Sequence, residues 1–312
     1  MKPALVLARP LPLADLGPLA GRFELRGGDV ALSRAELAAA VREAEVLVVT
    51  YLDRVDAALL EGAPRLRHVA SYGIGVNHLD LGACRARGLC VTNTPDVVTA
   101  ATADHAWALL LAAARRVAEG DRVIRAGGWT GVDPAWMLGT EVSGKTLGLV
   151  GFGRIGRAVA HRAAGFGMRV LYAAPRDAAV PGARRVDLDA LLAASDFVSL
   201  HVPLTPATDG LMDRARLARM KPGAILVNTA RGQVVDDAAL AEALASGRLA
   251  AAGLDVFRDE PRIPEAFLRL PSVVLTPHLG SGTRETRAAM TRMVLDEVLR
   301  VAAGDAPRHP VP

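Results

Sequence analysis

The sequence predicts an α/β protein whose strands form parallel sheets. Short apolar runs alternate with segments of helical period along almost the whole chain, which is the pattern of parallel strands connected by helices. Hydrophobic residues make up 51% of the chain and charged residues 22%, a composition typical of a folded globular protein. A chain of 312 residues is long enough for two domains of about 150 residues each.

The first third of the chain contains a first series of predicted elements. Ser33 and Glu36 have the spacing of a capping box, which predicts a helix from there to about Ala44. A longer apolar helix is predicted over residues 99–118, and Gly127 and Gly128 end the helical pattern. The predicted buried strands of this part are Ala4–Ala8, Val46–Thr50, His68–Ser71 and Leu89–Thr92.

A second series of elements begins at Thr146, with helices between most of its strands. The last helix is predicted from about Thr283 to Ala303, followed by Gly304 as its C′ residue. Two successive series of this kind predict two α/β domains. The predicted strands of the second series are Thr146–Val150, Arg169–Ala173, Phe197–Leu200, Ala224–Asn228, Ala251–Leu254 and Val273–Thr276.

Charge and cysteine content narrow the classes of partner. The chain has 37 basic and 33 acidic residues, a net charge of +4, without a run of five or six Lys and Arg, so we expect no nucleic-acid partner. This modest charge is compatible with a small anionic ligand. Cys84 and Cys90 have neither metal-ligand spacing nor the number of a disulfide framework, and we expect two buried thiols and no metal. No apolar run has the length of a signal segment or membrane span, so we expect a cytoplasmic protein with no membrane partner.

A glycine pattern between a strand and a helix predicts a dinucleotide-binding loop. Gly151, Gly153 and Gly156 follow the strand at 146–150 and open the next helix together with Arg154 and Ile155. In such a loop the first glycine permits the tight turn and the second lets the backbone approach a pyrophosphate. The third lets the helix pack close to the strand, so that helix N–H groups face the phosphates.

The end of the following strand bears on which dinucleotide is bound. A NAD site usually carries Asp or Glu there to hold the ribose 2′-OH. The corresponding residue is Ala174, followed by Pro175 and Arg176. A missing carboxylate removes repulsion against a 2′-phosphate, and Arg176 would pair with that phosphate. The sequence therefore favours NADP over NAD, with NAD the alternative if Arg176 is only a solvated loop residue.

Three polar residues follow strands of the second series. They are Arg231, Glu260 and His278. In an open α/β sheet, ligands bind outside the carboxyl ends of the strands, so all three are predicted near the reactive end of a dinucleotide. The ordinary pKa of an imidazole lies near neutrality, which suits a proton donor or acceptor. The other histidines are predicted to be structural, to begin a helix or to lie in the C-terminal tail: His68, His78, His105, His161, His201 and His309.

The chain resembles the D-isomer-specific 2-hydroxyacid dehydrogenases over essentially its whole length. The matching segments are residues 72–77, 151–156, 228–232, 255–261 and 277–281. The resemblance implies two Rossmann-like or flavodoxin-like parallel-sheet domains with an active-site cleft between them. The substrate-binding domain would be residues 1–98, completed by the C-terminal helix at 284–312. The dinucleotide-binding Rossmann domain would be residues 99–283.

The resemblance implies a role for each residue of the polar trio. His278 would protonate the carbonyl oxygen while hydride reaches the carbonyl carbon. Glu260 would hold the other ring nitrogen of His278 and favour the imidazolium. Arg231 would orient the carboxylate and polarise the carbonyl of a 2-oxoacid substrate.

Further positions follow from the same resemblance. Backbone N–H groups at Ile74, Gly75 and Val76 would receive the substrate carboxylate, and Leu52 and Tyr72 would shape the substrate side. Asp255 would meet the nicotinamide amide. The other expected cofactor contacts are Thr102, Val202, Pro203, Thr205, Thr229, Ala230, Gly280 and Ser281.

Two features resemble the NADPH-dependent glyoxylate/hydroxypyruvate reductases within this family. One is the missing acid at Ala174, and the other is the segment that contains Trp136, which in that subgroup reaches over the active site of a partner subunit. We therefore expect a homodimer that reduces a small 2-oxoacid to the 2-hydroxyacid, although ordinary packing of Trp136 in a dimer arm is equally compatible. The alternatives are an aromatic 2-oxoacid reductase and a dinucleotide-sensing, corepressor-like binding protein. Turnover of 2-oxoacids distinguishes the enzyme from the sensor.

Overall fold

The computed structural model describes residues 2–178 and 180–312, and the chain divides into two units. The first unit consists of Met1–Val98 together with Gly282–Pro312, and the second of Thr99–Ser281. The second unit is thus one continuous stretch of chain inserted into the first. Each unit contains a sheet in which all strand pairs are parallel, so the predicted α/β class is confirmed.

The sheet of the first unit has five strands in the order β2-β1-β3-β4-β5, which is the flavodoxin-like order. Its central strands are almost entirely buried because helices cover both faces, and most of their residues are apolar. Their bounds are β1 Ala4–Leu7, β2 Glu24–Gly27, β3 Ala44–Thr50, β4 His68–Tyr72 and β5 Cys90–Thr92.

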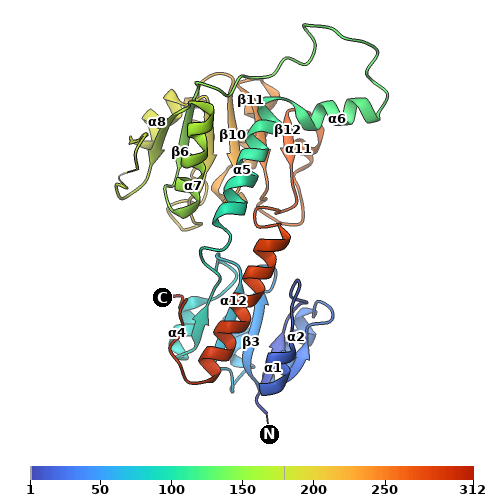
Figure 1. Cartoon of the computed structure of the whole chain (residues 1–312), viewed down its shortest axis with the longest axis vertical. Coiled ribbons are helices and arrows are strands. Elements are labelled where there is room, and N and C mark those ends of the chain that lie inside the picture. Colours follow the sequence, from blue (N-terminus) through green and yellow to red (C-terminus); the bar gives the residue numbers. More distant parts are fainter. Residues whose placement is uncertain (1, 179) are drawn as a thin grey trace. The chain divides into compact units, whose positions relative to one another are not determined.

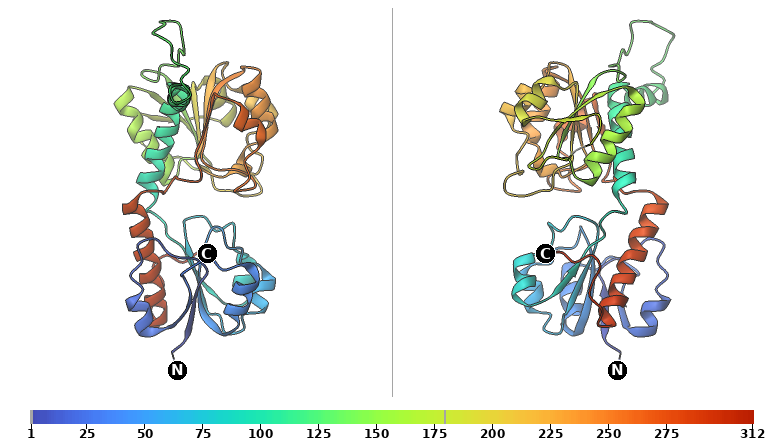
Figure 2. Two further views of the ribbon diagram at one scale, coloured as in Figure 1. Left: turned by 90° about the vertical axis from the view of Figure 1, so that its right-hand side faces the viewer. Right: turned by 60° about the vertical axis from the view of Figure 1, so that its left-hand side comes forward.

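The helices of the first unit pack on the two faces of its sheet (Figure 2). One face is covered by α1 (Gly17–Arg22) and α12 (Arg284–Ala302), whose Met290, Val294 and Val298 are buried against Leu5 and Leu7. The other face is covered by α2, α3 and α4. Their bounds are α2 Arg34–Ala40, followed by a 3-10 turn η1 at Val41–Glu43, α3 Ala57–Glu61 and α4 Leu81–Ala86.

The sheet of the second unit has seven strands in the order β12-β11-β10-β9-β6-β7-β8. The chain runs outward from β6 through β7 to β8, then returns to β9 on the other side of β6. The order therefore reverses between β6 and β9, which is the place where open α/β sheets bind ligands. The bounds are β6 Thr146–Val150, β7 Arg169–Ala173, β8 Ala183–Arg185, β9 Phe197–Leu200, β10 Ala224–Asn228, β11 Leu249–Leu254 and β12 Val273–Leu275.

Helices also cover both faces of the second sheet (Figures 1 and 2). On one face, α5 (Thr99–Ala114) and α7 (Arg154–Ala163) bury Leu109, Leu110 and Val159. The opposite face carries the helices that bury Leu191, Leu217, Leu240 and Phe267. They are α8 Leu188–Ala194, α9 Arg214–Arg219, α10 Asp237–Ala245 and α11 Glu265–Arg269, and two 3-10 turns, η2 Ala164–Phe166 and η3 Gly232–Val234, complete the unit.

The single helix predicted over residues 99–118 is wrong, because the chain turns at Arg116. Helix α5 ends at Ala114, and Arg116 has a left-handed φ of 54° that directs the chain into α6 (Val117–Arg125). The guanidinium of Arg116 binds both carboxylate oxygens of Glu119 at 2.8 Å, which fixes this corner. Helix α6 buries none of its residues, and it projects from the unit together with the loop that follows (Figure 1).

Smaller differences concern the ends of elements and the thiols. The helix that opens with the confirmed capping box of Ser33 and Glu36 ends before Ala44, which already begins β3. Strands β2 and β8 were not predicted. Cys84 is buried as expected, but Cys90 is half-buried. Within residues 2–178 and 180–312, no helix has the length and apolar character needed to cross a membrane.

Candidate active site

The glycine loop lies at the point where the strand order of the second unit reverses. Gly151 follows β6 with a φ of 94°, and a Cβ atom at this position would stand 2.6 Å from the carbonyl oxygen of His201, just beyond β9. Only glycine fits this conformation and this approach. Gly153 is the N-cap of the ten-residue α7, which begins at Arg154 without a side-chain cap. The N–H groups of its first turn are therefore available to an anion, as a pyrophosphate-binding loop requires.

The end of β7 borders an open hollow of about 490 Å³. The buried Tyr172 stacks on Phe152. Its hydroxyl forms hydrogen bonds with the Asp177 carboxylate and the backbone of Ala178, and these contacts fix residues 177 and 178 of the loop after β7. Arg176 is exposed between these contacts. The lining residues are Ala173, Ala174, Pro175, Arg185, Val186, Asp187 and Leu188.

Sequence reasoning missed Arg185 at this hollow. Its Nε and Nη2 donate hydrogen bonds to the carbonyl oxygens of Ala174 and Pro175, each at 3.0 Å. Asp187 also lines the hollow, but its carboxylate caps α8 by accepting from the Ala190 N–H at 2.8 Å. The hollow therefore carries a guanidinium anchored beside Ala174, with its one acid engaged in a helix cap.

The turn after β10 presents Arg231. Asn228 shapes this turn: its Oδ1 accepts from the Ala230 N–H at 3.0 Å, and its Nδ2 donates to the Arg231 carbonyl at 2.9 Å. The next residue, Gly232, passes so close to another segment that a Cβ there would stand 2.0 Å from the carbonyl carbon of Phe257. Because residue 232 is a glycine, the turn that carries Arg231 can pack directly against the backbone of Phe257 and Arg258, just before Glu260.

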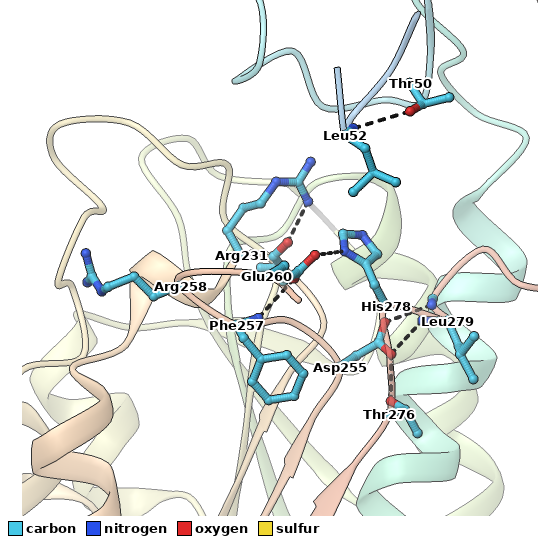
Figure 3. A network of polar contacts seen from close by, with 12 residues as sticks. Thr50, Leu52, Arg231, Asp255, Phe257, Arg258, Glu260, Thr276, His278 and Leu279 are labelled. Carbon is cyan, nitrogen blue, oxygen red and sulfur yellow. Dashed lines mark hydrogen bonds and ion pairs between the residues drawn. The ribbon is translucent and has the colours of Figure 1, made fainter. Parts of the chain in front are cut away.

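Glu260 and His278 form a direct pair (Figure 3). The Oε2 atom of Glu260 lies 2.8 Å from Nδ1 of His278, and its Oε1 accepts from the Phe257 N–H at 3.0 Å. Burial by itself raises the pKa of the Glu260 carboxyl. The hydrogen bonds from His278 and Phe257 and the positive charges of His278 and Arg231 outweigh this effect and hold the pKa of Glu260 below its ordinary value. The ionised carboxylate therefore holds the Nδ1 side of the His278 ring.

The turn that carries His278 is anchored by Asp255. His278 has a φ of 55°, and its N–H donates to the Asp255 carbonyl at 2.9 Å. The Asp255 side chain, 1% exposed, accepts from the N–H groups of Leu279 at 2.7 Å and Gly280 at 2.8 Å and from the Thr276 hydroxyl at 2.6 Å. Figure 3 shows the Arg231 and His278 side chains extending in the same direction from the ends of their strands.

Other expected cofactor residues of the second unit fall into two groups. Thr102 is buried, and a Cβ at Gly280 would stand 3.7 Å from its hydroxyl. Thr229 is also buried, and its hydroxyl has no hydrogen-bond partner within the described residues, which fits a site where a polar ligand supplies one. The more accessible residues are Val202, Pro203, Thr205 and Ser281.

Of the expected substrate residues, Trp136 is exposed in the segment after α6, and the others belong to the first unit. Leu52 is exposed, and its N–H donates to the Thr50 hydroxyl at 3.3 Å (Figure 3). Ile74 is exposed, and Gly75 and Val76 are partly exposed. Tyr72 differs from them, because only 2% of it is exposed and its hydroxyl donates to the Arg287 carbonyl in α12 at 3.2 Å. Its side chain belongs to the core of the first unit.

No cluster of three or more His, Cys, Asp or Glu residues in the described part of the chain has the arrangement of a metal site.

Similar proteins place the chain in a family. The profile of the D-isomer-specific 2-hydroxyacid dehydrogenase NAD-binding domain matches residues 107–280. Glyoxylate reductase of Thermococcus litoralis is 45% identical over 98% of this chain and 96% of its own length, and that of Pyrococcus furiosus is 46% identical over 98% and 94%.

Solved structures agree with the sequence relatives. A Thermus thermophilus protein matches with a TM-score of 0.94 at 47% identity, over 99% of this chain and 100% of the other. The NADPH-dependent glyoxylate/hydroxypyruvate reductase of Sinorhizobium meliloti, solved with NADP and malonate, matches with a TM-score of 0.90 at 34% identity, over 100% and 97%. With the glycine loop at the strand-order reversal and the histidine–glutamate pair nearby, these matches identify the chain as an NAD(P)-dependent oxidoreductase that belongs to the D-isomer-specific 2-hydroxyacid dehydrogenase family.

Proposed function

We propose that the protein reduces glyoxylate, or a 2-oxoacid of similar size such as hydroxypyruvate, with NADPH. The observation that carries this proposal is the pairing of His278 with the ionised Glu260 beside Arg231, at the end of the sheet where the glycine loop lies. Full-length relatives named glyoxylate reductase at about 45% identity support the same substrate class.

The three polar side chains divide the work of carbonyl reduction. When bound, NADPH supplies the hydride for the carbonyl carbon. Nε2 of His278 donates the proton that the carbonyl oxygen needs as charge develops on it. Glu260 favours the imidazolium through Nδ1 and fixes the plane of the ring. The guanidinium of Arg231 binds the substrate carboxylate and carbonyl oxygens, which orients the carbonyl and stabilises the developing negative charge.

The preference for NADP rests on the end of β7. The expected acid is replaced by Ala174, so a 2′-phosphate meets no carboxylate at that position. Arg176 would pair with the phosphate, and Arg185 keeps the backbone of Ala174 and Pro175 in place. The NADP found in the Sinorhizobium meliloti relative agrees with this assignment.

The remaining cofactor contacts follow the course of a dinucleotide along the strand ends. The pyrophosphate would lie against Gly151, Gly153, Arg154, Ile155 and Gly156. The adenosine side would lie against Val202, Pro203 and Thr205. The nicotinamide side would meet Thr102, Thr229, Ala230, Asp255, Gly280 and Ser281.

The first unit supplies the rest of the substrate site in this proposal. Residues 1–98 and 284–312 would form the substrate-binding domain and residues 99–283 the dinucleotide-binding domain. The N–H groups of Ile74, Gly75 and Val76 would hold the substrate carboxylate, and Leu52 would border the substrate. Tyr72 would act through the position of the 73–76 turn, because its own side chain is buried.

We propose a homodimer formed through α6 and the loop that follows. This segment exposes several large apolar side chains, which a monomer would leave in water. A second copy of the chain would cover them, and Trp136 would then reach the active site of the other subunit. The exposed apolar residues are Val117, Ile124, Trp129, Val132, Trp136 and Leu138.

The test is a steady-state assay of NADPH oxidation with glyoxylate, hydroxypyruvate, pyruvate and hydroxyphenylpyruvate. We expect the highest kcat/KM with glyoxylate or hydroxypyruvate, and the H278A variant should lose at least ~100-fold in kcat. Preference for hydroxyphenylpyruvate would replace the small substrate by an aromatic one. No turnover of any of the four, alongside tight NADPH binding, would reject catalysis in favour of a dinucleotide-sensing role.

A further inference from the structure

His105 lies on α5, more than 120 residues before Arg231, Glu260 and His278 in the sequence, but its side chain contacts Asp255 and Thr276, which support the His278 turn. Its Nε2 atom is 3.1 Å from Oδ1 of Asp255 and 3.0 Å from Oγ1 of Thr276. The side chain is 17% exposed, so these contacts are largely shielded from water. His105 therefore links the long helix α5 to the strand ends from which Asp255 and the His278 turn emerge.

The hydrogen positions at this contact follow from the partners. The Thr276 hydroxyl lies 2.6 Å from Oδ1 of Asp255, and because a carboxylate oxygen only accepts, the hydroxyl proton points to Asp255. The Thr276 oxygen is then an acceptor toward His105. Since both atoms near Nε2 of His105 are acceptors, this nitrogen carries a proton and donates to the two of them.

The carboxylate that receives this proton holds the backbone of the catalytic turn. Oδ1 of Asp255 accepts from the Leu279 N–H at 2.7 Å and Oδ2 accepts from the Gly280 N–H at 2.8 Å, directly after His278. Because His278 adopts a left-handed φ of 55°, which is unfavourable for a residue with a side chain, the turn needs such contacts to persist.

The charge of Asp255 depends on the donors around it. Burial raises the pKa of the Asp255 carboxyl, but the hydrogen bonds from His105, Thr276 and Leu279 outweigh burial, so its pKa lies below the ordinary value. His105 stands first among the groups that lower this pKa. The carboxylate is thus kept ionised, and an ionised oxygen accepts more strongly from the two N–H groups of the turn.

We propose that His105 is a positioning residue for catalysis, which sets the orientation of His278 through Asp255 and the backbone of residues 278–280. The proposal rests on the proposed role of His278 as proton donor. His105 touches neither substrate nor cofactor in this scheme. Oδ1 of Asp255 accepts from His105, Thr276 and Leu279. Oδ2 accepts from the Gly280 N–H, so each carboxylate oxygen holds one of the two N–H groups that follow His278.

The experiment compares H105L, H105Q and H161L. Leucine removes the donor at a similar volume, whereas the glutamine amide reaches the position of Nε2 and donates. His161, exposed on α7, is the matched control. For each variant, kcat and KM for glyoxylate, the Kd for NADPH and the thermal unfolding midpoint are measured.

We expect H105L to lower kcat about 10-fold, because displacing a catalytic group by a fraction of an ångström has an effect of this order. The KM for glyoxylate and the Kd for NADPH should change less than kcat, H105Q should recover most of the activity, and H161L should match the original protein.

Two results would overturn the proposal. An unchanged kcat in H105L would mean that the Asp255 turn holds without His105. If kcat fell equally in H105L and H105Q, and only as far as the fraction of folded protein fell, His105 would serve stability alone. Both results leave H278A inactive and so leave the proposed function intact. If H278A instead kept its full kcat, the proposed function would fail and the role of His105 would fail with it.

Discussion

The carboxylate of Glu260 lies 2.8 Å from Nδ1 of His278 while its second oxygen lies 3.0 Å from the backbone nitrogen of Phe257. The histidine ring is therefore tied to a fixed point of the backbone through one side chain. Because the pKa of Glu260 is lowered by these contacts, the carboxylate stays ionised at neutral pH and favours a proton on the histidine.

Replacing Glu260 by glutamine should narrow the pH range of reduction. The amide keeps the shape of the carboxylate but not its charge, so the imidazolium loses its stabilisation. We expect the reductive kcat/KM of E260Q to decline at a lower pH than in the original protein, because a neutral amide does not attract the proton that the reaction consumes. A pH–rate profile with NADPH measures this shift. E265Q, at an exposed glutamate on α11, serves as the control, and coincident profiles for E260Q and E265Q would contradict the role of Glu260.

Gly151→Ala should weaken dinucleotide binding. The added Cβ would stand 2.6 Å from the His201 carbonyl oxygen, and the φ of 94° is strained for alanine, so the loop must shift. A backbone strain of this kind costs roughly 1–3 kcal/mol, which corresponds to a Kd for NADPH roughly 5- to 160-fold higher. Gly165→Ala, where an added Cβ has open space, should leave the Kd unchanged. Titration by NADPH fluorescence distinguishes the two.

Arg176→Ala should lower the preference for NADPH over NADH. Removing the guanidinium removes a charge-assisted contact worth roughly 1.5–3 kcal/mol, so kcat/KM for NADPH should fall about 10-fold or more while the value for NADH stays similar. Arg185→Ala frees the carbonyls of Ala174 and Pro175 and should also reduce the NADPH preference. Arg184, exposed beside it on β8, is the control position. A parallel decline with both cofactors in Arg176→Ala would contradict a 2′-phosphate contact.

The buried His68 should lower the free energy of unfolding as the pH falls below 6.5. Its Nε2 contacts the Thr92 hydroxyl at 2.9 Å, its Nδ1 is buried without a partner in the described part of the chain, and burial lowers its pKa from 6.5 to about 4. Between pH 6.5 and 4 the unfolded chain binds a proton that the folded chain does not, so the free energy of unfolding falls as the pH falls through this window. The loss amounts to about 3 kcal/mol.

Urea unfolding at several pH values measures this dependence. His68→Asn should reduce the slope between pH 6.5 and 4. His201, whose pKa burial also lowers to about 4, should maintain the rest of the slope, and the exposed His161→Asn should leave the slope unchanged. Identical slopes in the original protein and in His68→Asn would show that other groups cause the acid sensitivity.

Charge in the segment after α6 should prevent dimer formation. Val132 is 89% exposed and Leu138 69% exposed, so Val132→Glu and Leu138→Glu change no core contact. We expect each variant to elute as a monomer. At high protein concentration, its thermal unfolding midpoint should be lower than that of the original protein. Leu268→Glu, on α11, is the control with a similar exposure. Light scattering after gel filtration gives the mass, and a monomeric original protein would reject the dimer.

The sequence predicted the central strands correctly because each is a short, mostly apolar run with helices on both faces. It did not predict β2 and β8, which lie at sheet edges and are largely exposed, so neither contains the apolar pattern of a buried strand. The turn at Arg116 was also missed, since the apolar residues of α5 continue into α6 without a Gly or Pro to mark the break.

The ends of the strands predicted that Glu260 and His278 lie near each other, and the resemblance to the D-isomer-specific 2-hydroxyacid dehydrogenases implied their direct pairing. Arg185 and His105 could not be found in this way. Arg185 lies on a strand without a recognisable pattern, and His105 lies inside a helix, so its contact with Asp255 depends on how that helix packs on the sheet. Tyr72 was expected at the substrate, but the position of α12 over β4, which buries it, depends on contacts across more than 200 residues of sequence.

The division of the chain has a consequence for the order in which the protein takes shape on the ribosome. One face of the first sheet is closed by α12, whose buried Met290, Val294 and Val298 come from the last part of the chain. Residues 99–281 must be synthesised before that helix exists, and they contain everything their own unit needs. During synthesis, the inserted unit therefore completes its core first, while the face of the earliest sheet that carries Leu5 and Leu7 has only α1 on it and lacks the cover of α12 until translation is nearly finished.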